Sequence, residues 1–179
     1  MTDIEKQPLP EDLSDCILAE TRTIFTIAQL SENLSAIGHL LQQSQNSIDI
    51  FSHLLDHRVF DQNTVLDAIR NMVVGSTRAS VRILVSEPQF MISHGHRIIE
   101  LARRLSSHIE IRKTHQHYAH SRHMFVIADQ RGYVYKESDE RYEGLVNFND
   151  PAQCREWRNT FNEAWEHSQA ISDFRRLHI

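Results

Sequence analysis

The 179-residue sequence predicts an α/β protein, because short runs rich in β-branched residues alternate with amphipathic helical segments. Residues 81–85 (VRILV) form the clearest strand segment, an apolar run that follows a helix-terminating glycine. Residues 62–74 carry apolar side chains at helical spacing, which predicts a helix with one buried face. Residues 152–168 place three aromatic side chains at successive fourth positions, which predicts a C-terminal helix with an apolar stripe.

The N-terminal part of the chain supplies further elements. Residues 1–19 hold two prolines and five acidic residues and predict a flexible arm. The β-branched residues of 22–27 predict a first strand, and 30–41 then carry leucine and isoleucine at helical spacing, with Ser31 placed to cap. Residues 48–51 (IDIF) alternate their side chains between two faces, as in a strand.

The elements after residue 85 follow the same alternation. Residues 96–105 predict a helix with apolar side chains inward and arginines outward. Residues 108–113 alternate as a strand, and 123–128 (HMFVIA) are apolar and short enough for a buried strand. A turn over 130–132 leads into a further strand over 133–135, so this stretch predicts a hairpin.

Length and composition indicate one main domain over residues 20–170, between the arm and a C-terminal tail over 171–179. The net charge of −5 argues against a general nucleic-acid coat. No apolar run approaches the roughly 20 residues of a membrane helix, and the N-terminus lacks the pattern of a signal peptide, so we expect a cytoplasmic protein. Cys16 and Cys154 stand outside any CxxC pair and predict reduced thiols.

The stretch 119–149 resembles the C-terminal part of a phospholipase D-like domain. A strand ends at Asp129, a second strand follows the turn, and Gly144 and Asn147 come shortly after it. That superfamily carries His-x-Lys-x4-Asp on the first strand and Gly-Ser-x-Asn after the second. The resemblance extends over about residues 22–168, and implies a mixed sheet of about six to seven strands with helices on both faces.

Two details outside this stretch also carry the resemblance. A helix that runs directly into Ser47-Ile48-Asp49-Ile50 is similar to the opening of such domains, and Phe161-x3-Trp165 is similar to their closing helix. The tail over 171–179 resembles the ending of a bacterial group of degenerate phospholipase D-like domains to which no activity is assigned.

The motif that carries the family's chemistry is degenerate in this chain. With Asp129 as the motif aspartate, the histidine position falls on Arg122 and the lysine position on Met124. With Gly144 as the motif glycine, Leu145 takes the place of the serine. The family's reaction needs an imidazole that attacks phosphorus and cationic groups that hold the phosphoryl oxygens. The resemblance therefore implies a domain without phospholipase D-type activity and without a cofactor.

The inherited cleft is nevertheless the first candidate for a binding site. The family geometry implies that His53, Arg122, Met124 and Asn147 converge, with Asp129 at the far end of its strand. Arg122 could then hold a phosphate or another anion as a bidentate fork, or the cleft could receive a protein partner in a regulatory or assembly role. The alternative is a filled cleft in which Arg122 pairs with Asp129 or a neighbouring acidic residue.

The sequence leaves two other functions open. One is a diverged phosphodiesterase or nuclease that uses His120 or His123. The other is a nucleic-acid-binding protein with a basic face within residues 97–113. The five basic residues of that face are Arg97, Arg103, Arg104, Arg112 and Lys113.

The histidine-rich run over 115–123 has no carboxylate or cysteine at ligand spacing, so we expect no metal site there. Single phospholipase D-like units often pair about a two-fold axis, so the resemblance also implies a homodimer.

Overall fold

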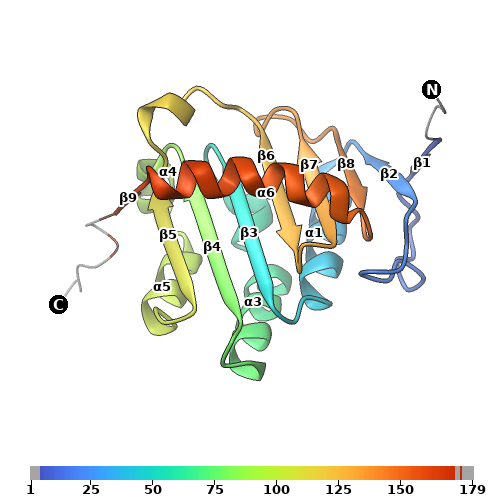
Figure 1. Ribbon diagram of the computed structural model, residues 1–179, viewed down its shortest axis with the longest axis horizontal. Helices are drawn as coiled ribbons and strands as arrows, with labels where there is room; N and C mark the ends of the chain where they lie inside the picture. The colour runs from blue at the N-terminus through green and yellow to red at the C-terminus, as the bar shows by residue number, and fades with distance from the viewer. Residues whose placement is uncertain (1–4, 172–173, 175–179) are drawn as a thin grey trace.

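The computed structural model describes residues 5–171 and residue 174. Within them a nine-stranded mixed sheet runs in the order β1-β2-β8-β7-β6-β3-β4-β5-β9 (Figure 1). The strands are β1 Lys6–Pro8, β2 Ile24–Ile27, β3 Ser47–Ser52, β4 Ser80–Val85, β5 Ile109–Lys113, β6 Met124–Ala128, β7 Gly132–Lys136, β8 Gly144–Asn147 and β9 Gln169–Ala170. The predicted mixed sheet is confirmed, and the count exceeds the expected six to seven because β1 and β9 are short strands at its two edges.

The sheet joins a parallel half to an antiparallel half. Strands β3, β4 and β5 are parallel neighbours. The chain crosses between them through α3 (Asn63–Gly75) and α5 (Arg97–Arg104), as parallel pairing requires. From β6 the chain turns back in a meander, so that β6, β7, β8 and β2 are antiparallel neighbours.

Helices cover both faces of the sheet, as predicted. Figure 1 shows α1 (Leu30–Gln42), α3 and α5 behind the sheet, while α6 (Pro151–Glu166) alone crosses its front. The shorter helices are α2 (His57–Phe60), α4 (Pro88–Ser93) and the 3-10 turn η1 (Gln116–Tyr118). No helix among the described residues is long and apolar enough to cross a membrane.

Each face of the sheet has its own apolar core, as the two-residue period of the strands requires. Ile48 and Ile50 of β3 point toward α1 and α3, whereas Phe51 points toward α6. On the α6 side, Phe161 is fully buried and Trp157 stacks on the ring of Tyr135 at 4.6 Å. The aromatic stripe of the C-terminal helix therefore packs against the front of the sheet.

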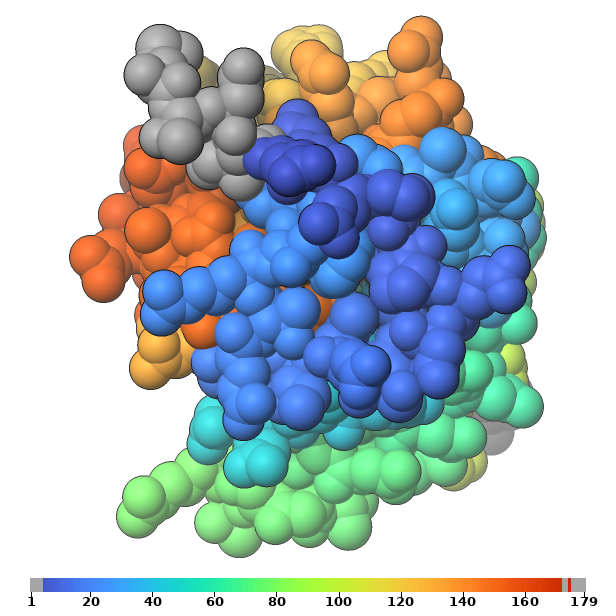
Figure 2. Space-filling model, turned by 90° about the vertical axis from the view of Figure 1, so that its right-hand side faces the viewer, coloured from blue at the N-terminus to red at the C-terminus, as the bar shows by residue number. Residues whose placement is uncertain are grey.

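The N-terminal segment lies along the β2 edge of the sheet (Figure 2). Strand β1 pairs in parallel with β2, and the side chains of Leu13 and Cys16 are buried. The backbone N–H of Leu18 donates to the side chain of Gln43 on the loop after α1, at 2.8 Å. Residues 1–4 and most of the tail over 171–179 fall outside the described part of the chain. The proposed division into arm, domain and tail stays a prediction.

Candidate functional site

A cluster of buried polar side chains lies where β3 ends, and we call it the Asp139 cluster: Ser52, His53, Asp56, Lys136 and Asp139. Asp139 belongs to the loop between β7 and β8, and its side chain is 1% exposed. Its Oδ2 accepts hydrogen bonds from the Ser52 hydroxyl at 2.6 Å and from the backbone N–H groups of His53 and Leu54 at 2.8 and 2.9 Å. One carboxylate therefore fixes the chain just beyond β3.

The second charge of the cluster is the ammonium group of Lys136, at the end of β7. The side chain of Lys136 is 1% exposed, and its Nζ lies 3.6 Å from Asp139 Oδ1. Nζ also donates to the Asp139 carbonyl oxygen at 3.2 Å. Burial lowers the pKa of Lys136, while the negative charges of Asp139 and Asp56 act in the opposite direction.

Asp56 completes the cluster at the N-cap of α2. The Arg58 side chain binds it in bidentate geometry, with both nitrogen-to-oxygen distances 3.0 Å, and Tyr142 donates its hydroxyl at 3.3 Å. Burial raises the pKa of Asp56, but the hydrogen bonds from Arg58 outweigh it and hold the pKa below its ordinary value. The charges of the Asp139 cluster are thus paired with one another and with their immediate neighbours.

His53, Arg122 and Met124 lie at this end of the sheet. His53 is buried, and burial together with the charge of Arg122 lowers its pKa. Met124 is buried at the start of β6, opposite Lys136 in the register of β6 and β7. Arg122 forms an ion pair with Glu140 at 3.2 Å, and both side chains are at least half exposed. The acidic partner of Arg122 is therefore Glu140 and not Asp129.

Asp129 and Asn147 lie toward the opposite end of the sheet. Strand β6 separates Asp129 from Arg122, and its five residues span about 13 Å. The Asp129 carboxylate accepts hydrogen bonds at 2.8 Å from each of the three consecutive backbone N–H groups of residues 45–47. Asn147 donates to the Arg22 carbonyl oxygen and accepts from the Asn149 N–H. Asp129 therefore lies at the far end of its strand, and Asn147 lies at that end too instead of beside His53, Arg122 and Met124.

The sequence reasoning missed Asp139, Lys136 and Ser52. The run 139–143 reads as a charged surface loop, because four of its five residues are charged: three are acidic and one is an arginine. In the structure Asp139 turns inward, while Glu140 stays at the surface. A lysine that ends an otherwise apolar strand was the one available signal, since lysines are rarely buried without a partner.

The two histidines of the phosphodiesterase alternative differ in their surroundings. Both are exposed on the segment before β6. His123 Nδ1 lies 2.9 Å from the Tyr135 hydroxyl, and the two rings stack at 5.9 Å. No hydrogen bond fixes the ring of His120 within residues 5–171. Among these same residues, no group of three or more histidine, cysteine or acidic side chains could hold a metal ion.

The basic residues between 97 and 113 lie on two sides of the sheet. Arg97, Arg103 and Arg104 are on α5 behind it, whereas Arg112 packs over the ring of Trp165 on α6 in front of it, at 4.4 Å. Each of these four arginines has a carboxylate within 4 Å. The acidic partners are Asp61 for Arg97, Glu100 for Arg103 and Arg104, and Glu110 for Arg112. The five residues therefore do not form one continuous basic face.

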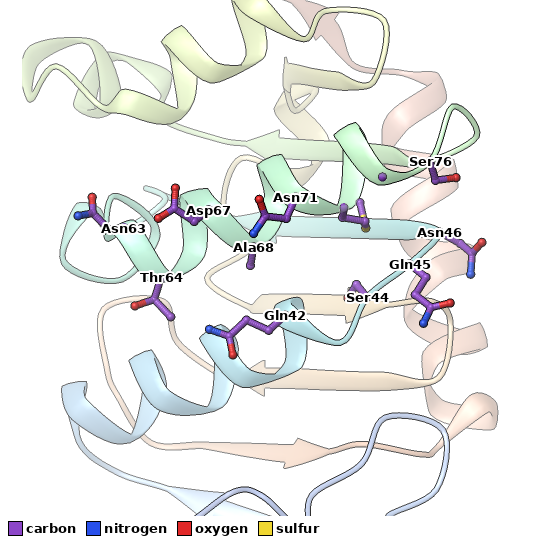
Figure 3. A pocket seen from close by; sticks show the side chains of 12 residues that line it. Gln42, Ser44, Gln45, Asn46, Asn63, Thr64, Asp67, Ala68, Asn71 and Ser76 are labelled. Carbon is purple, nitrogen blue, oxygen red and sulfur yellow. The ribbon is translucent and has the colours of Figure 1, made fainter.

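A polar groove of about 660 Å³ runs between α1 and α3 (Figure 3). Side chains with neutral amides face it, among them Gln42 on α1 and Asn71 on α3. Asp67 is the one charged residue in its lining, and it forms an ion pair with Arg70. The residues that line the groove include no histidine, cysteine, lysine or arginine.

A family model described as a domain of unknown function (DUF7931) matches residues 29–177. The chain belongs to this family. Among curated proteins, none matches the chain.

Solved structures resemble the fold over most of the chain. TrmBL2, an archaeal chromatin protein with a novel mode of DNA binding, matches with a TM-score of 0.63 at 15% identity. The match covers 89% of this chain and 57% of TrmBL2, so the chain spans little more than half of that protein. Nuc from Salmonella typhimurium, a phospholipase D family member, matches with a TM-score of 0.56 at 14% identity, over 83% of this chain and 97% of Nuc. NucT from Helicobacter pylori matches with a TM-score of 0.58 at 12% identity, over 84% of this chain and 98% of NucT. The predicted phospholipase D-like fold is thereby confirmed.

Proposed function

We propose that this chain is a catalytically inactive phospholipase D-like binding module. The observation that carries the proposal is the internal pairing of charge at the end of the sheet where the family's histidine and lysine positions fall. The Asp139 carboxylate accepts three hydrogen bonds and forms an ion pair with Lys136, and Arg122 forms an ion pair with Glu140. A buried cluster whose charges are paired stabilises a conformation, whereas phosphoryl transfer needs a nucleophile that is free to reach phosphorus.

The residues at the motif positions support the same reading. Arg122 is a guanidinium that stays protonated and cannot attack phosphorus, and Met124 offers neither charge nor a hydrogen-bond donor. The fold does not demand catalysis, since one fold commonly hosts several unrelated functions. We therefore expect the chain to recognise a phosphate-bearing ligand or a protein partner, in a regulatory or assembly role. A cytoplasmic location and a homodimer stay predictions.

The test is an assay with bis(p-nitrophenyl) phosphate, single-stranded DNA and phosphatidylcholine, with an active phospholipase D run in parallel. We expect the chain to hydrolyse none of these substrates faster than the background measured without protein. The variants His120→Ala and His123→Ala should leave that background unchanged, as should His167→Ala, an exposed histidine at the far end of α6 that serves as the matched control. Turnover that disappears in His120→Ala or His123→Ala but persists in His167→Ala would establish the diverged phosphodiesterase instead.

Nucleic-acid binding is the second candidate, and the likeness of the fold to that of TrmBL2 favours it. Retention on single- or double-stranded DNA that weakens steeply with salt would support it, because phosphate contacts release counterions. The variant Arg103→Glu/Arg104→Glu tests whether α5 makes those contacts. Unchanged retention of this variant on DNA would show that the interface does not include Arg103 and Arg104.

A further inference from the structure

A small pocket of about 350 Å³ lies in front of the sheet, where the turn between β6 and β7 meets the first turns of α6. We call it the arginine pocket. The residues that line it and matter here are Asp129, Gln130, Arg131, Arg155, Arg158 and Asn159. Its volume is at the lower end of the range of about 300–1,000 Å³ typical of small-molecule sites.

The three arginines converge from two separate elements. Arg155, Arg158 and Asn159 share one face of α6, since residues three and four apart are neighbours on a helix. Arg131 comes from the turn that follows β6, where Asp129 and Gln130 have φ values of 50° and 59°. The Asp150 N–H donates to the Arg131 carbonyl oxygen at 2.7 Å, which ties this turn to the start of α6. A backbone hydrogen bond therefore fixes the element that carries Arg131 next to the helix that carries Arg155 and Arg158.

Arg158 is oriented by contacts within the protein. Its Nε donates to Asp49 at 3.2 Å, and its Nη1 donates to the Gln130 side chain at 3.0 Å. Asp49 is buried and also binds Arg82 at 2.8 Å, so its charge is shared between two guanidinium groups. The remaining nitrogen of Arg158, Nη2, has no hydrogen bond within the described residues.

Arg131 and Arg155 lack such partners. Neither side chain makes a hydrogen bond or an ion pair with any of the residues that the structure describes. Asp129 is the one acidic residue of the lining, and its two oxygens already accept three backbone N–H groups from residues 45–47. The pocket therefore gathers three arginines, two of which have no acidic partner among the described residues, in a chain whose net charge is −5.

We propose that the arginine pocket binds a small molecule that carries a phosphomonoester or diphosphate group. Guanidinium groups match phosphate oxygens in bidentate geometry, and several converging on one point favour a multiply charged phosphate over a carboxylate with two oxygens. The amide groups of Gln130 and Asn159 supply further polar contacts at the rim. The α6 N-terminus is not the source of recognition, because Asp150 already caps it through the Gln153 N–H.

This site rests on the proposed binding role and gives it a ligand class and a location. It lies at the opposite end of β6 from Arg122, so binding there is independent of the Asp139 cluster. The hydrolysis assay and the binding experiment can therefore fail separately.

The experiment is isothermal titration calorimetry of the full chain with inorganic pyrophosphate. The test variant is Arg131→Ser/Arg155→Ser, which removes two exposed arginines that have no partner in the described fold. The control is Arg78→Ser/Arg141→Ser, which makes the same change in net charge on the loop before β4 and on the loop between β7 and β8. We expect pyrophosphate to bind the wild-type chain and the control equally. The test variant should bind at least tenfold more weakly, which corresponds to about 1.4 kcal/mol.

Two further titrations identify the kind of molecule that carries the phosphate. Adenosine monophosphate and glycerol phosphate are titrated separately, and tighter binding of one assigns the ligand to nucleotides or to lipid-type phosphates. Circular dichroism and a thermal melt check that Arg131→Ser/Arg155→Ser and the single variant Arg155→Ser remain folded. Absence of pyrophosphate binding to the wild-type chain overturns the proposal, as does equal weakening in the test and control variants.

Discussion

Replacement of Asp139 by asparagine should destabilise the protein far more than its position in a charged loop indicates. The substitution keeps the size of the side chain and one oxygen, which can still accept from Ser52 and the backbone after β3. It replaces Oδ1, 3.6 Å from the Lys136 ammonium, with an amide that carries no negative charge. Lys136 is 1% exposed, so its charge would remain buried without its nearest counter-ion.

Removal of one partner from a buried ion pair costs about 3–5 kcal/mol. A typical domain has a free energy of unfolding of about 5–15 kcal/mol, so Asp139→Asn should remove a large part of it. Glu140→Gln is the matched control, because it neutralises the adjacent acid in the same loop. The Arg122–Glu140 pair is 50% and 61% exposed, and exposed pairs of this kind contribute below about 1 kcal/mol.

The measurement is urea unfolding at pH 7, followed by the fluorescence of Trp157 and Trp165. A third variant, Lys136→Met/Asp139→Asn, separates loss of the ion pair from a general effect of mutation. It removes the stranded charge, so it should be more stable than Asp139→Asn alone, and the double-mutant cycle should be non-additive by more than about 0.5 kcal/mol. If Asp139→Asn unfolds with a free energy within about 1 kcal/mol of wild type at an unchanged m-value, the ion pair does not stabilise the fold by the expected amount of about 3–5 kcal/mol.

Three other outcomes are expected. Gly144→Ala should destabilise the protein by about 1–3 kcal/mol in urea unfolding, because a Cβ there would overlap the Tyr135 carbonyl oxygen. Gly75→Ala, at the exposed end of α3 with open space around it, should be neutral or stabilising by up to about 1 kcal/mol. Equal changes in the free energy of unfolding for Gly144→Ala and Gly75→Ala would show that the close contact at Gly144 is not the cause. Burial, as the main cause, lowers the pKa of His96 from 6.5 to about 4. The folded state therefore takes up this proton less readily than the unfolded state, and stability should fall by about 3 kcal/mol as the pH drops from 6.5 to 4. His96→Asn should flatten that slope in pH-dependent urea melts, and an unchanged slope would exclude His96 as its source. Burial raises the pKa of Cys154 to about 12, so Ellman's reagent at pH 8 should label this thiol only on unfolding. Rapid labelling of the native chain at Cys154 would show that the apolar core between α6 and the sheet opens readily.

The sequence by itself determined the elements that have a clear period. The strands that became β3, β4 and β6, and the aromatic stripe of α6, follow from alternation and helical spacing, which depend only on neighbouring residues. The same local information, together with the family resemblance, predicted the mixed sheet with helices on both faces. The short edge strands β1 and β9 were missed because two or three residues cannot show a period.

The tertiary structure alone decided which polar groups meet. Asp139 reaches Ser52 across 87 residues, and this contact depends on the register of β7 against β6 and of β6 against β3. The register of β8 against β7 also places Asn147 at the Asp129 end of the sheet, and the fold brings Arg131 beside Arg155, which no local pattern joins. Such pairings are set by the burial of the whole sheet, because a shift of one residue would turn every side chain to the wrong face.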